Sequence, residues 1–185
     1  MSLTKTPICN FGEKAKDFSL ISTENKKISL KDIVGENGTL IMFICNHCPY
    51  VKAVIKSISL DAKEIESLGI KTVAIMSNDT KNYPEDSLEN MITFAKSNNF
   101  DQLNYLIDEK QEVAKKFKAV CTPDFFGYNR DLQLQYRGRF KELKDLKPIN
   151  EKDSDLKLAM NMIANTQKGP SKQVPSMGCS IKWFN

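Results

Sequence analysis

Buried strands and one amphipathic helix dominate the pattern of apolar and polar residues in the first half of the chain. Thr39 to Ile44 is an almost continuous apolar run, which predicts a buried strand. From Val51 onwards, apolar residues recur every three or four positions, which predicts a helix that ends at Gly69. The run from Ile70 to Met76 is rich in β-branched residues and predicts the next strand. These elements form a βαβ unit, so we expect two parallel strands joined by a right-handed crossover.

Shorter elements are predicted on both sides of this unit. The alternation in residues 15–20 and 27–30 predicts two short strands or a hairpin. After the unit we expect a helix at 87–96, a strand at 105–107 and a helix capped by Asp108, with Gln111 three residues later. A hairpin is expected at 122–128 with 132–136, and a last helix at 153–166. The pattern indicates an α/β protein with one domain, residues 1–185, in which 1–37 is an N-terminal extension and 167–185 a C-terminal tail.

Composition and charge exclude several classes of function. The hydrophobic fraction of 41% and the charged fraction of 27% are typical of a globular protein. The net charge is +4 without a block of basic residues, so nothing favours nucleic acid as a partner. Neither a signal-peptide core at residues 1–12 nor a membrane-spanning apolar run is present, so we expect a cytoplasmic protein without a membrane partner.

Cys45 and Cys48 carry the most specific chemical signal in the chain, because they lie three residues apart where the buried strand passes into the helix. If the helix starts at the motif, Cys45 lies at or just before its N-terminus, where unpaired N–H groups favour a thiolate. The spacing brings the two cysteines to about 5 Å, close enough for a disulfide. In a reducing compartment such a pair is catalytic, redox-sensing or metal-binding rather than a structural staple. No bound cofactor is needed, because the electrons reside on the sulfurs.

His47 is the only histidine in the chain and lies between the two cysteines. Its imidazole can stabilise the Cys45 thiolate and so lower the pKa of that cysteine. The alternative is a solvent-exposed residue of the first helical turn without a redox role.

The other interpretations of the motif concern the core and metal ions. Cysteine is often a small core residue, so Cys45 and Cys48 can simply be buried. A zinc site wants four ligands, and with one histidine and no second C-x-x-C the chain would have to recruit Cys121, Cys179 or carboxylates.

Cys121 directly precedes the dipeptide Thr122-Pro123. It is either a third redox cysteine or a small buried residue, and the same choice applies with less support to Cys9 and Cys179. On its own, a proline at the start of a strand is expected to follow a trans peptide bond.

Several motifs resemble a known family. The chain is similar to thioredoxin-fold proteins of the alkyl hydroperoxide reductase and thiol-specific antioxidant family, in their thioredoxin-like branch often labelled peroxiredoxin-like. The matching segments are Cys45-Asn46-His47-Cys48-Pro49-Tyr50-Val51, Ser77-Asn78-Asp79, Tyr83-Pro84-Glu85-Asp86-Ser87, Cys121-Thr122-Pro123-Asp124-Phe125-Phe126 and Gly178-Cys179-Ser180-Ile181-Lys182-Trp183.

The resemblance implies a thioredoxin-like fold, with a central mixed β-sheet flanked by helices and an N-terminal β-hairpin extension. It implies that Cys45 is the attacking thiol and Cys48 the resolving thiol. It further implies that Pro123 is a cis-proline facing the pair, and that Thr122 offers backbone hydrogen bonds to a bound polypeptide or thiol partner.

The chain departs from the family pattern at two places. Peroxiredoxins carry a threonine three residues before the peroxide-attacking cysteine. That threonine is replaced by Cys45 if Cys48 attacks, and by Met42 if Cys45 attacks. Thioredoxin has a buried aspartate six residues before its first cysteine, where this chain has Thr39.

The function predicted from these observations is a thiol-disulfide oxidoreductase that acts on a protein or small-molecule disulfide or thiol. The alternative is a peroxiredoxin-like thiol peroxidase that reduces hydroperoxides. A metal-binding or redox-sensing protein is the third hypothesis.

Overall fold

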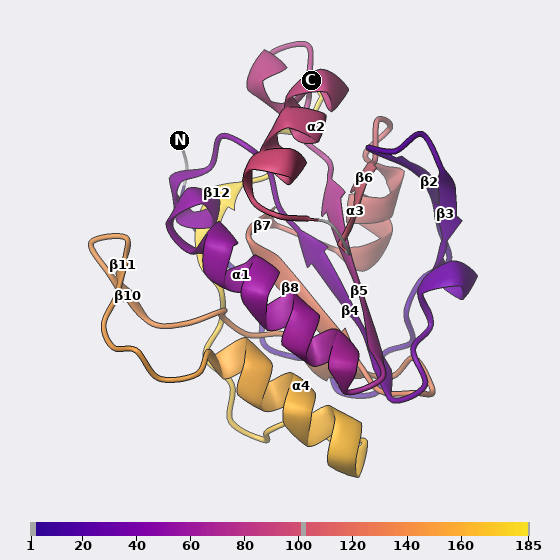
Figure 1. The fold of residues 1–185 in the computed structure, drawn as a ribbon, viewed down its shortest axis with the longest axis vertical. Coiled ribbons are helices and arrows are strands. Elements are labelled where there is room, and N and C mark those ends of the chain that lie inside the picture. Colours follow the sequence, from indigo (N-terminus) through magenta and orange to yellow (C-terminus); the bar gives the residue numbers. More distant parts are fainter. Residues whose placement is uncertain (1–2, 101–102, 185) are drawn as a thin grey trace.

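The computed structural model of the protein describes residues 3–100 and 103–184, and a seven-stranded mixed sheet forms its centre (Figure 1). Along the sheet the strands follow the order β3-β2-β6-β5-β4-β8-β9. The three central strands, β6, β5 and β4, run parallel, and antiparallel pairs extend the sheet on both edges. The strands are β2 (Ser19–Ser22), β3 (Lys27–Ser29), β4 (Gly38–Phe43), β5 (Ile70–Met76), β6 (Asn104–Ile107), β8 (Asp124–Tyr128) and β9 (Leu134–Tyr136).

The βαβ unit predicted from the apolar pattern is confirmed. Every residue of β4 is buried, and β4 pairs in parallel with β5, with Ile41 opposite Val73. The connecting helix is α1 (Pro49–Ser67). It ends as expected at Gly69, whose φ of +77° lies in the left-handed region that glycine adopts without a steric penalty. The carboxyl ends of β4 and β5 therefore lie at the edge of the sheet where the cysteine motif begins.

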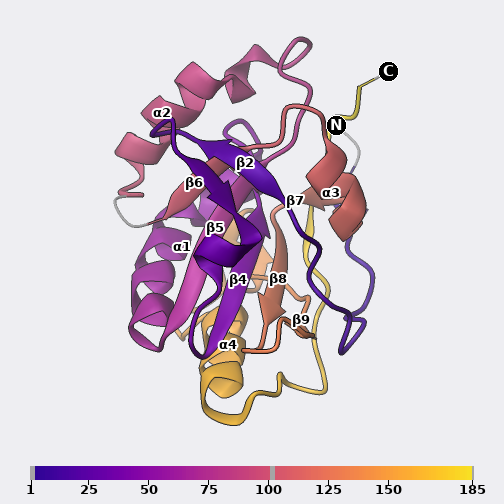
Figure 2. The same cartoon turned by 90° about the vertical axis from the view of Figure 1, so that its right-hand side faces the viewer.

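Helices cover both faces of the sheet, as Figure 2 shows. Helices α1, α2 (Leu88–Ser97) and α4 (Asp155–Thr166) pack on one face. Helix α3 (Glu112–Phe117) and the 3-10 turn η1 (Leu30–Ile33) pack on the other. The alternation of β4 explains this arrangement, because Leu40 and Met42 belong to the first apolar cluster while Ile41 and Phe43 belong to the second. The predicted central mixed sheet flanked by helices is thus confirmed.

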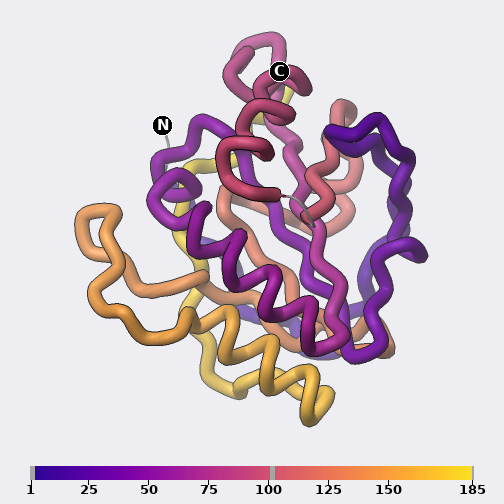
Figure 3. The backbone as a smooth tube through the Cα atoms, viewed as in Figure 1, coloured from indigo at the N-terminus to yellow at the C-terminus, as the bar shows by residue number. Residues whose placement is uncertain are grey.

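Segments from both ends of the chain meet in a second, three-stranded sheet, and Figure 3 shows how the chain returns there. Strand β12 (Met177–Ser180) lies between β1 (Leu3–Lys5) and β7 (Cys121–Thr122), antiparallel to both. A separate hairpin is formed by β10 (Leu143–Lys144) and β11 (Lys147–Pro148). These pairings support the single-domain organisation of residues 1–185, which stays a prediction.

Three local predictions are refined. The N-terminal hairpin forms as expected, but it is part of the main sheet, because β2 also pairs with β6. Helix α2 begins after Ser87, whose hydroxyl accepts a hydrogen bond from the Asn90 N–H. The capping box expected at Asp108 is wrong in detail: α3 begins later, and the Asp108 carboxylate accepts from the N–H groups of Val113 and Ala114.

None of the helices in the described residues combines the length and apolar character that crossing a bilayer requires.

Candidate active site

The cysteine motif forms the loop between β4 and α1. The helix begins only at Pro49, so Cys48 is its N-cap residue and Cys45 lies three residues earlier. This corrects the expectation that the helix starts at the motif with Cys45 at its end. The reason is that proline favours the first helical position, where its missing N–H costs nothing. The unpaired N–H groups of the first turn therefore face Cys48 more directly than Cys45.

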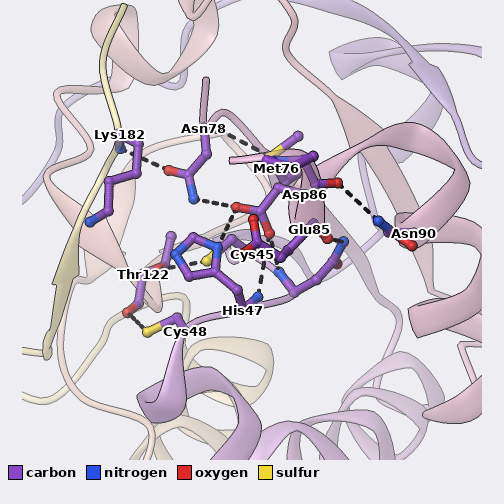
Figure 4. A network of polar contacts seen from close by, with 12 residues as sticks. Cys45, His47, Cys48, Met76, Asn78, Glu85, Asp86, Asn90, Thr122 and Lys182 are labelled. Atoms are coloured by element: carbon purple, nitrogen blue, oxygen red, sulfur yellow. Dashed lines mark hydrogen bonds and ion pairs between the residues drawn. The ribbon is translucent and has the colours of Figure 1, made fainter. Parts of the chain in front are cut away.

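The two thiols are buried together opposite Thr122. Cys45 is 1% exposed and Cys48 is 0% exposed, and their side chains hydrogen-bond each other. The Thr122 hydroxyl oxygen lies 3.3 Å from Cys45 Sγ, and the Cys48 thiol donates to the Thr122 carbonyl oxygen over 3.1 Å (Figure 4). The peptide bond between Thr122 and Pro123 is cis, as the family resemblance implied. Both motif cysteines and the cis-proline segment thus form one cluster.

The cysteine pair holds one proton and one negative charge at neutral pH. The hydrogen bond from Cys45 is the main cause that lowers the pKa of Cys48 to about 5, and the same bond raises the pKa of Cys45 well above its ordinary value. Surrounding donors serve both sulfurs. The N–H groups of Val51 and Cys179 stabilise a charge on Cys48. The Thr122 hydroxyl stabilises a charge on Cys45, while the Thr122 carbonyl favours a proton on Cys48. Each sulfur therefore has a partner for its anionic form.

A buried aspartate holds the motif loop in place. Asp86, in the 3-10 turn η2 (Pro84–Asp86), is 0% exposed. Its Oδ1 accepts from the backbone N–H groups of Asn46 and His47, at 2.8 and 3.3 Å. Its Oδ2 accepts from the Asn78 amide at 2.7 Å, and the Asn78 Oδ1 in turn accepts from the Lys182 N–H at 2.9 Å (Figure 4). One carboxylate thereby connects the motif loop, the loop after β5 and the C-terminal segment.

The imidazole of His47 pairs with this carboxylate. Its Nδ1 lies 2.7 Å from Asp86 Oδ2, and its ring stacks on Tyr83 with the planes 9° apart. The side chain is only 10% exposed, so the alternative of a solvent-exposed residue does not hold. The hydrogen bond with Asp86 is the main cause that raises the pKa of His47 above its ordinary value. The other ring nitrogen, Nε2, is buried and has no partner among the described residues.

These residues suit a metal ion poorly. A ring nitrogen of His47, the Cys45 sulfur and a carboxylate oxygen of Asp86 lie within 4.8 Å of one another. However, the two Asp86 oxygens already accept four hydrogen bonds from described groups. These four bonds occupy the lone-pair positions that a carboxylate offers. Asp86 is therefore placed to orient the motif loop and His47 rather than to coordinate a cation.

The remaining cysteines differ in their relation to the pair. Cys121 is fully buried, and its thiol donates to the Pro123 carbonyl over 3.6 Å. Burial raises the pKa of Cys121, and its redox role stays a prediction. Cys179 hydrogen-bonds the Cys48 side chain. Cys9 lies apart, near Arg137, and burial raises its pKa to about 11.

A buried ion pair lies behind the cis-proline segment. Asp124 follows Pro123 and is 0% exposed, and its Oδ2 accepts from Arg137 Nη2 at 3.0 Å. The Arg137 guanidinium also lies 4.5 Å from the centre of the Phe126 ring and donates to the Lys118 carbonyl. The pair thus fixes the start of β8, directly after Thr122 and Pro123.

A pocket of about 450 Å³ lies beside Pro123. Its walls are mainly apolar, with basic residues among them, and its lining includes Tyr50, Val54, Pro123, Phe140, Lys5 and Lys141. Tyr50 lies two residues after Cys48, and Pro123 directly follows Thr122, which contacts both sulfurs. The pocket therefore borders the site.

The sequence pattern missed the polar residues that support the motif. Asp86 and Asn78 both lie in segments that carried the family resemblance, which was the available signal. Asn46 belongs to the motif itself: its amide donates to the Glu85 carbonyl, and its oxygen accepts from the buried Tyr105 hydroxyl at 3.0 Å. These contacts join residues about forty or more positions apart, so no local pattern reveals them.

Comparisons with known proteins agree with the geometry. Residues 11–140 match the model of the AhpC/TSA family. An uncharacterized conserved protein from Geobacillus kaustophilus is 39% identical, with a TM-score of 0.89 over 100% of this chain and 97% of that chain. No curated protein sequence gave a match.

More distant solved structures share the fold. A peroxidoxin from Mycobacterium tuberculosis is 17% identical, with a TM-score of 0.58 over 86% of this chain and 93% of its own. A secreted disulfide oxidoreductase from the same organism is also 17% identical, with a TM-score of 0.54 over 64% of this chain and 80% of its own. At this identity the two structures establish a common thioredoxin-like fold.

Proposed function

The chain belongs to the AhpC/TSA family, and we propose that it is a thiol-disulfide oxidoreductase whose redox centre is the pair Cys45 and Cys48. Membership of this family supports a thiol redox function. Exchange with a disulfide partner is supported by the contact between two buried thiols that share one proton opposite the cis-proline segment. A protein or small-molecule disulfide is the proposed partner.

The first step is attack by Cys45. In the reduced pair the hydrogen bond from Cys45 favours the charge on Cys48. Cys45 becomes the thiolate when the shared proton passes to Cys48, where the Thr122 carbonyl accepts it, and the Thr122 hydroxyl then stabilises the charge on Cys45. The thiolate displaces one sulfur of the partner disulfide, so a mixed disulfide forms on Cys45 and one partner thiolate leaves.

The second step is resolution by Cys48. Once Cys45 is bonded to the partner, the N–H groups of Val51 and Cys179 still stabilise a charge on Cys48. Loss of its proton lets the Cys48 thiolate attack the Cys45 sulfur, which releases the second partner thiolate and closes the Cys45–Cys48 disulfide. Two electrons have then passed from the pair to the partner. The one proton of the pair ends on one released sulfur, and the other sulfur leaves as a thiolate that still has to take up a proton.

His47 is proposed as the proton donor to a departing thiolate. Asp86 holds its Nδ1 and raises its pKa, so the imidazolium form persists to higher pH. Its Nε2 is the buried polar side-chain atom without a partner among the described residues, and so remains able to donate. Thr122 and Pro123 are proposed to contact the partner, whose side chain would enter the pocket beside Tyr50 and Pro123.

Reduction of insulin by dithiothreitol, with and without the protein, tests this function. We expect the wild-type protein to accelerate reduction, and the Cys45→Ser variant to give no acceleration. A Cys9→Ser variant is the matched control, because Cys9 lies outside the pair. Equal acceleration by the wild-type and Cys45→Ser proteins would overturn the proposal.

A cytoplasmic location stays a prediction, for cell fractionation to test.

A thiol peroxidase is the second candidate, and the burial of both sulfurs favours it. At 1% and 0% exposure, the pair admits a small oxidant more readily than a large one. A thiolate would attack the peroxide oxygen, giving a sulfenic acid and water or an alcohol, and the other thiol would form the disulfide with loss of water. Peroxide consumption sustained by dithiothreitol, and lost in Cys45→Ser and Cys48→Ser variants, identifies this route.

A further inference from the structure

Cys179 reaches the redox pair from the C-terminal strand. In the register of β12 with β7, Cys179 lies opposite Thr122, whose carbonyl contacts the Cys48 sulfur. The Cys179 side chain hydrogen-bonds the Cys48 side chain, and its backbone N–H also donates to Cys48. Cys45, Cys48 and Cys179 belong to the same buried apolar cluster. The Cys48 side chain therefore has two cysteine neighbours, Cys45 from the motif loop and Cys179 from β12.

The close approach of β12 depends on the residue before Cys179. A Cβ atom on Gly178 would lie 2.0 Å from the Thr122 carbonyl oxygen, so a larger residue would push the strand away. The Ser176 hydroxyl, at the start of this segment, donates to the Pro123 carbonyl at 2.7 Å. The chain thus holds Cys179 against the segment that faces the pair.

We propose that Cys179 is a second partner of Cys48, which takes over the disulfide from Cys45 after each turnover. The inference rests on the proposed function and deepens it. In this step the Cys179 thiolate attacks the Cys48 sulfur of the Cys45–Cys48 disulfide. The Cys48–Cys179 bond forms, the Cys45–Cys48 bond breaks, and Cys45 leaves as a thiolate. The proton lost by Cys179 matches the one that Cys45 regains on equilibration, so no external oxidant or reductant is needed.

The charges around Cys179 change when the pair is oxidised. In the reduced protein, burial and then the hydrogen bond and charge of Cys48 raise the pKa of Cys179 to about 11. Formation of the Cys45–Cys48 disulfide removes the Cys48 charge, and with it part of the reason that Cys179 keeps its proton. The nearby Lys182 ammonium favours the Cys179 thiolate. Oxidation of the pair therefore makes the Cys179 thiolate easier to form.

Cys121 provides a contrast within the same sheet. It is the neighbour of Thr122 in β7, and successive side chains of a strand point to opposite faces. Its thiol donates to the Pro123 carbonyl instead of contacting Cys48. The geometry therefore assigns the exchange with Cys48 to Cys179 and makes Cys121 a matched control.

Disulfide mapping in a Cys45→Ser variant tests the proposal. After oxidation with one equivalent of diamide and an acid quench, trypsin would place Cys48 in residues 32–52, Cys179 in 173–182 and Cys121 in 119–130. We expect most of the oxidised variant to carry the 32–52 peptide linked to 173–182. The link should persist in Cys45→Ser/Cys121→Ser and disappear in Cys45→Ser/Cys179→Ser. Absence of the link from variants with native circular dichroism would overturn the inference.

Oxidation of the wild-type protein, measured together with insulin reduction, distinguishes failure of this inference from failure of the proposed function. We expect one-equivalent oxidation of the wild-type protein to yield two species, the internal Cys45–Cys48 disulfide and the peptide pair joined through Cys179. The internal disulfide alone, with insulin reduction intact, would refute the role of Cys179 and leave the proposed function standing. Loss of insulin reduction with both linkages present would refute the proposed function alone.

Discussion

His47 Nδ1 lies 2.7 Å from the Oδ2 of Asp86, a carboxylate that is 0% exposed. The two residues are 39 positions apart and come from the motif loop and from the turn η2. The same carboxylate accepts backbone N–H groups of the motif loop, so one contact network fixes both the loop and the imidazole. The loop that carries the cysteines is held by a charge outside the C-x-x-C motif.

The protonation of His47 is directly measurable, because the chain has one histidine and therefore one set of imidazole NMR signals. Since Asp86 raises the pKa of His47 in the folded protein, the midpoint should lie above the ordinary value of about 6.5. The stabilisation from the pair is fully present below the unfolded pKa and is lost as pH rises through the folded pKa. A midpoint at or below the ordinary value would contradict the ion pair.

Replacing Asp86 should loosen the motif loop. The Asp86→Asn variant removes the charge that pairs with His47 and weakens the bonds to two backbone N–H groups. We expect the free energy of unfolding to fall by about 3 kcal/mol, and the pKa of His47 to fall towards its ordinary value. Urea unfolding and the histidine titration measure the two effects. Asp79→Asn, at another buried carboxylate of the same loop region, is the control and should leave the His47 pKa unchanged.

The Thr122 hydroxyl should set the reactivity of the cysteine pair. Thr122→Val keeps the shape of the side chain but removes the hydroxyl that lies 3.3 Å from Cys45 Sγ. Because a hydrogen bond to a charged group contributes about 1.5 kcal/mol or more, alkylation of the pair by iodoacetamide at neutral pH should slow about tenfold. Thr72→Val is the matched control, since the buried Thr72 hydroxyl bonds Glu66 instead. Equal slowing in both variants would mean that the effect is not local.

The ion pair behind Pro123 should matter for stability. Arg137→Leu leaves the Asp124 carboxylate buried without its partner, and this should cost about 3–5 kcal/mol in the free energy of unfolding. The double variant Arg137→Leu/Asp124→Leu removes both charges, so it should recover part of the loss. Denaturant unfolding of the two variants tests this expectation, which fails if the single variant is as stable as the wild type.

The main sheet and its helices were predictable because the signals are local. The apolar run of β4 and the helical stripe of α1 each reflect burial of one short segment, and together they imply the parallel βαβ unit. The start of α1 was less predictable, since Pro49 shifts the N-cap to Cys48. The pattern of apolar residues therefore predicted that the motif lies between a strand and a helix, whereas the first residue of the helix is known only from the structure.

The supporting residues of the site were not predictable in the same way. Asp86 looks like one charge in a polar loop, and only the packing of η2 against the motif loop makes it buried. The cis peptide before Pro123 runs against the usual preference, and only the family resemblance indicated it. Cys179 reaches Cys48 through the pairing of β12 with β7, which joins segments more than fifty residues apart. Such contacts depend on topology rather than on local periodicity.

Trapping a disulfide partner on Cys45 tests directly whether Cys45 attacks and Cys48 resolves. The Cys48→Ser and Cys45→Ser variants are each mixed in reduced form with oxidised glutathione, quenched in acid and analysed by intact mass and peptide mapping. We expect Cys48→Ser to accumulate a glutathione adduct on Cys45, because the resolving thiol is missing, and Cys45→Ser to lose insulin reduction. Full insulin reduction by the Cys45→Ser variant, or no adduct on Cys45 in the Cys48→Ser variant, would show that Cys45 is not the attacking thiol.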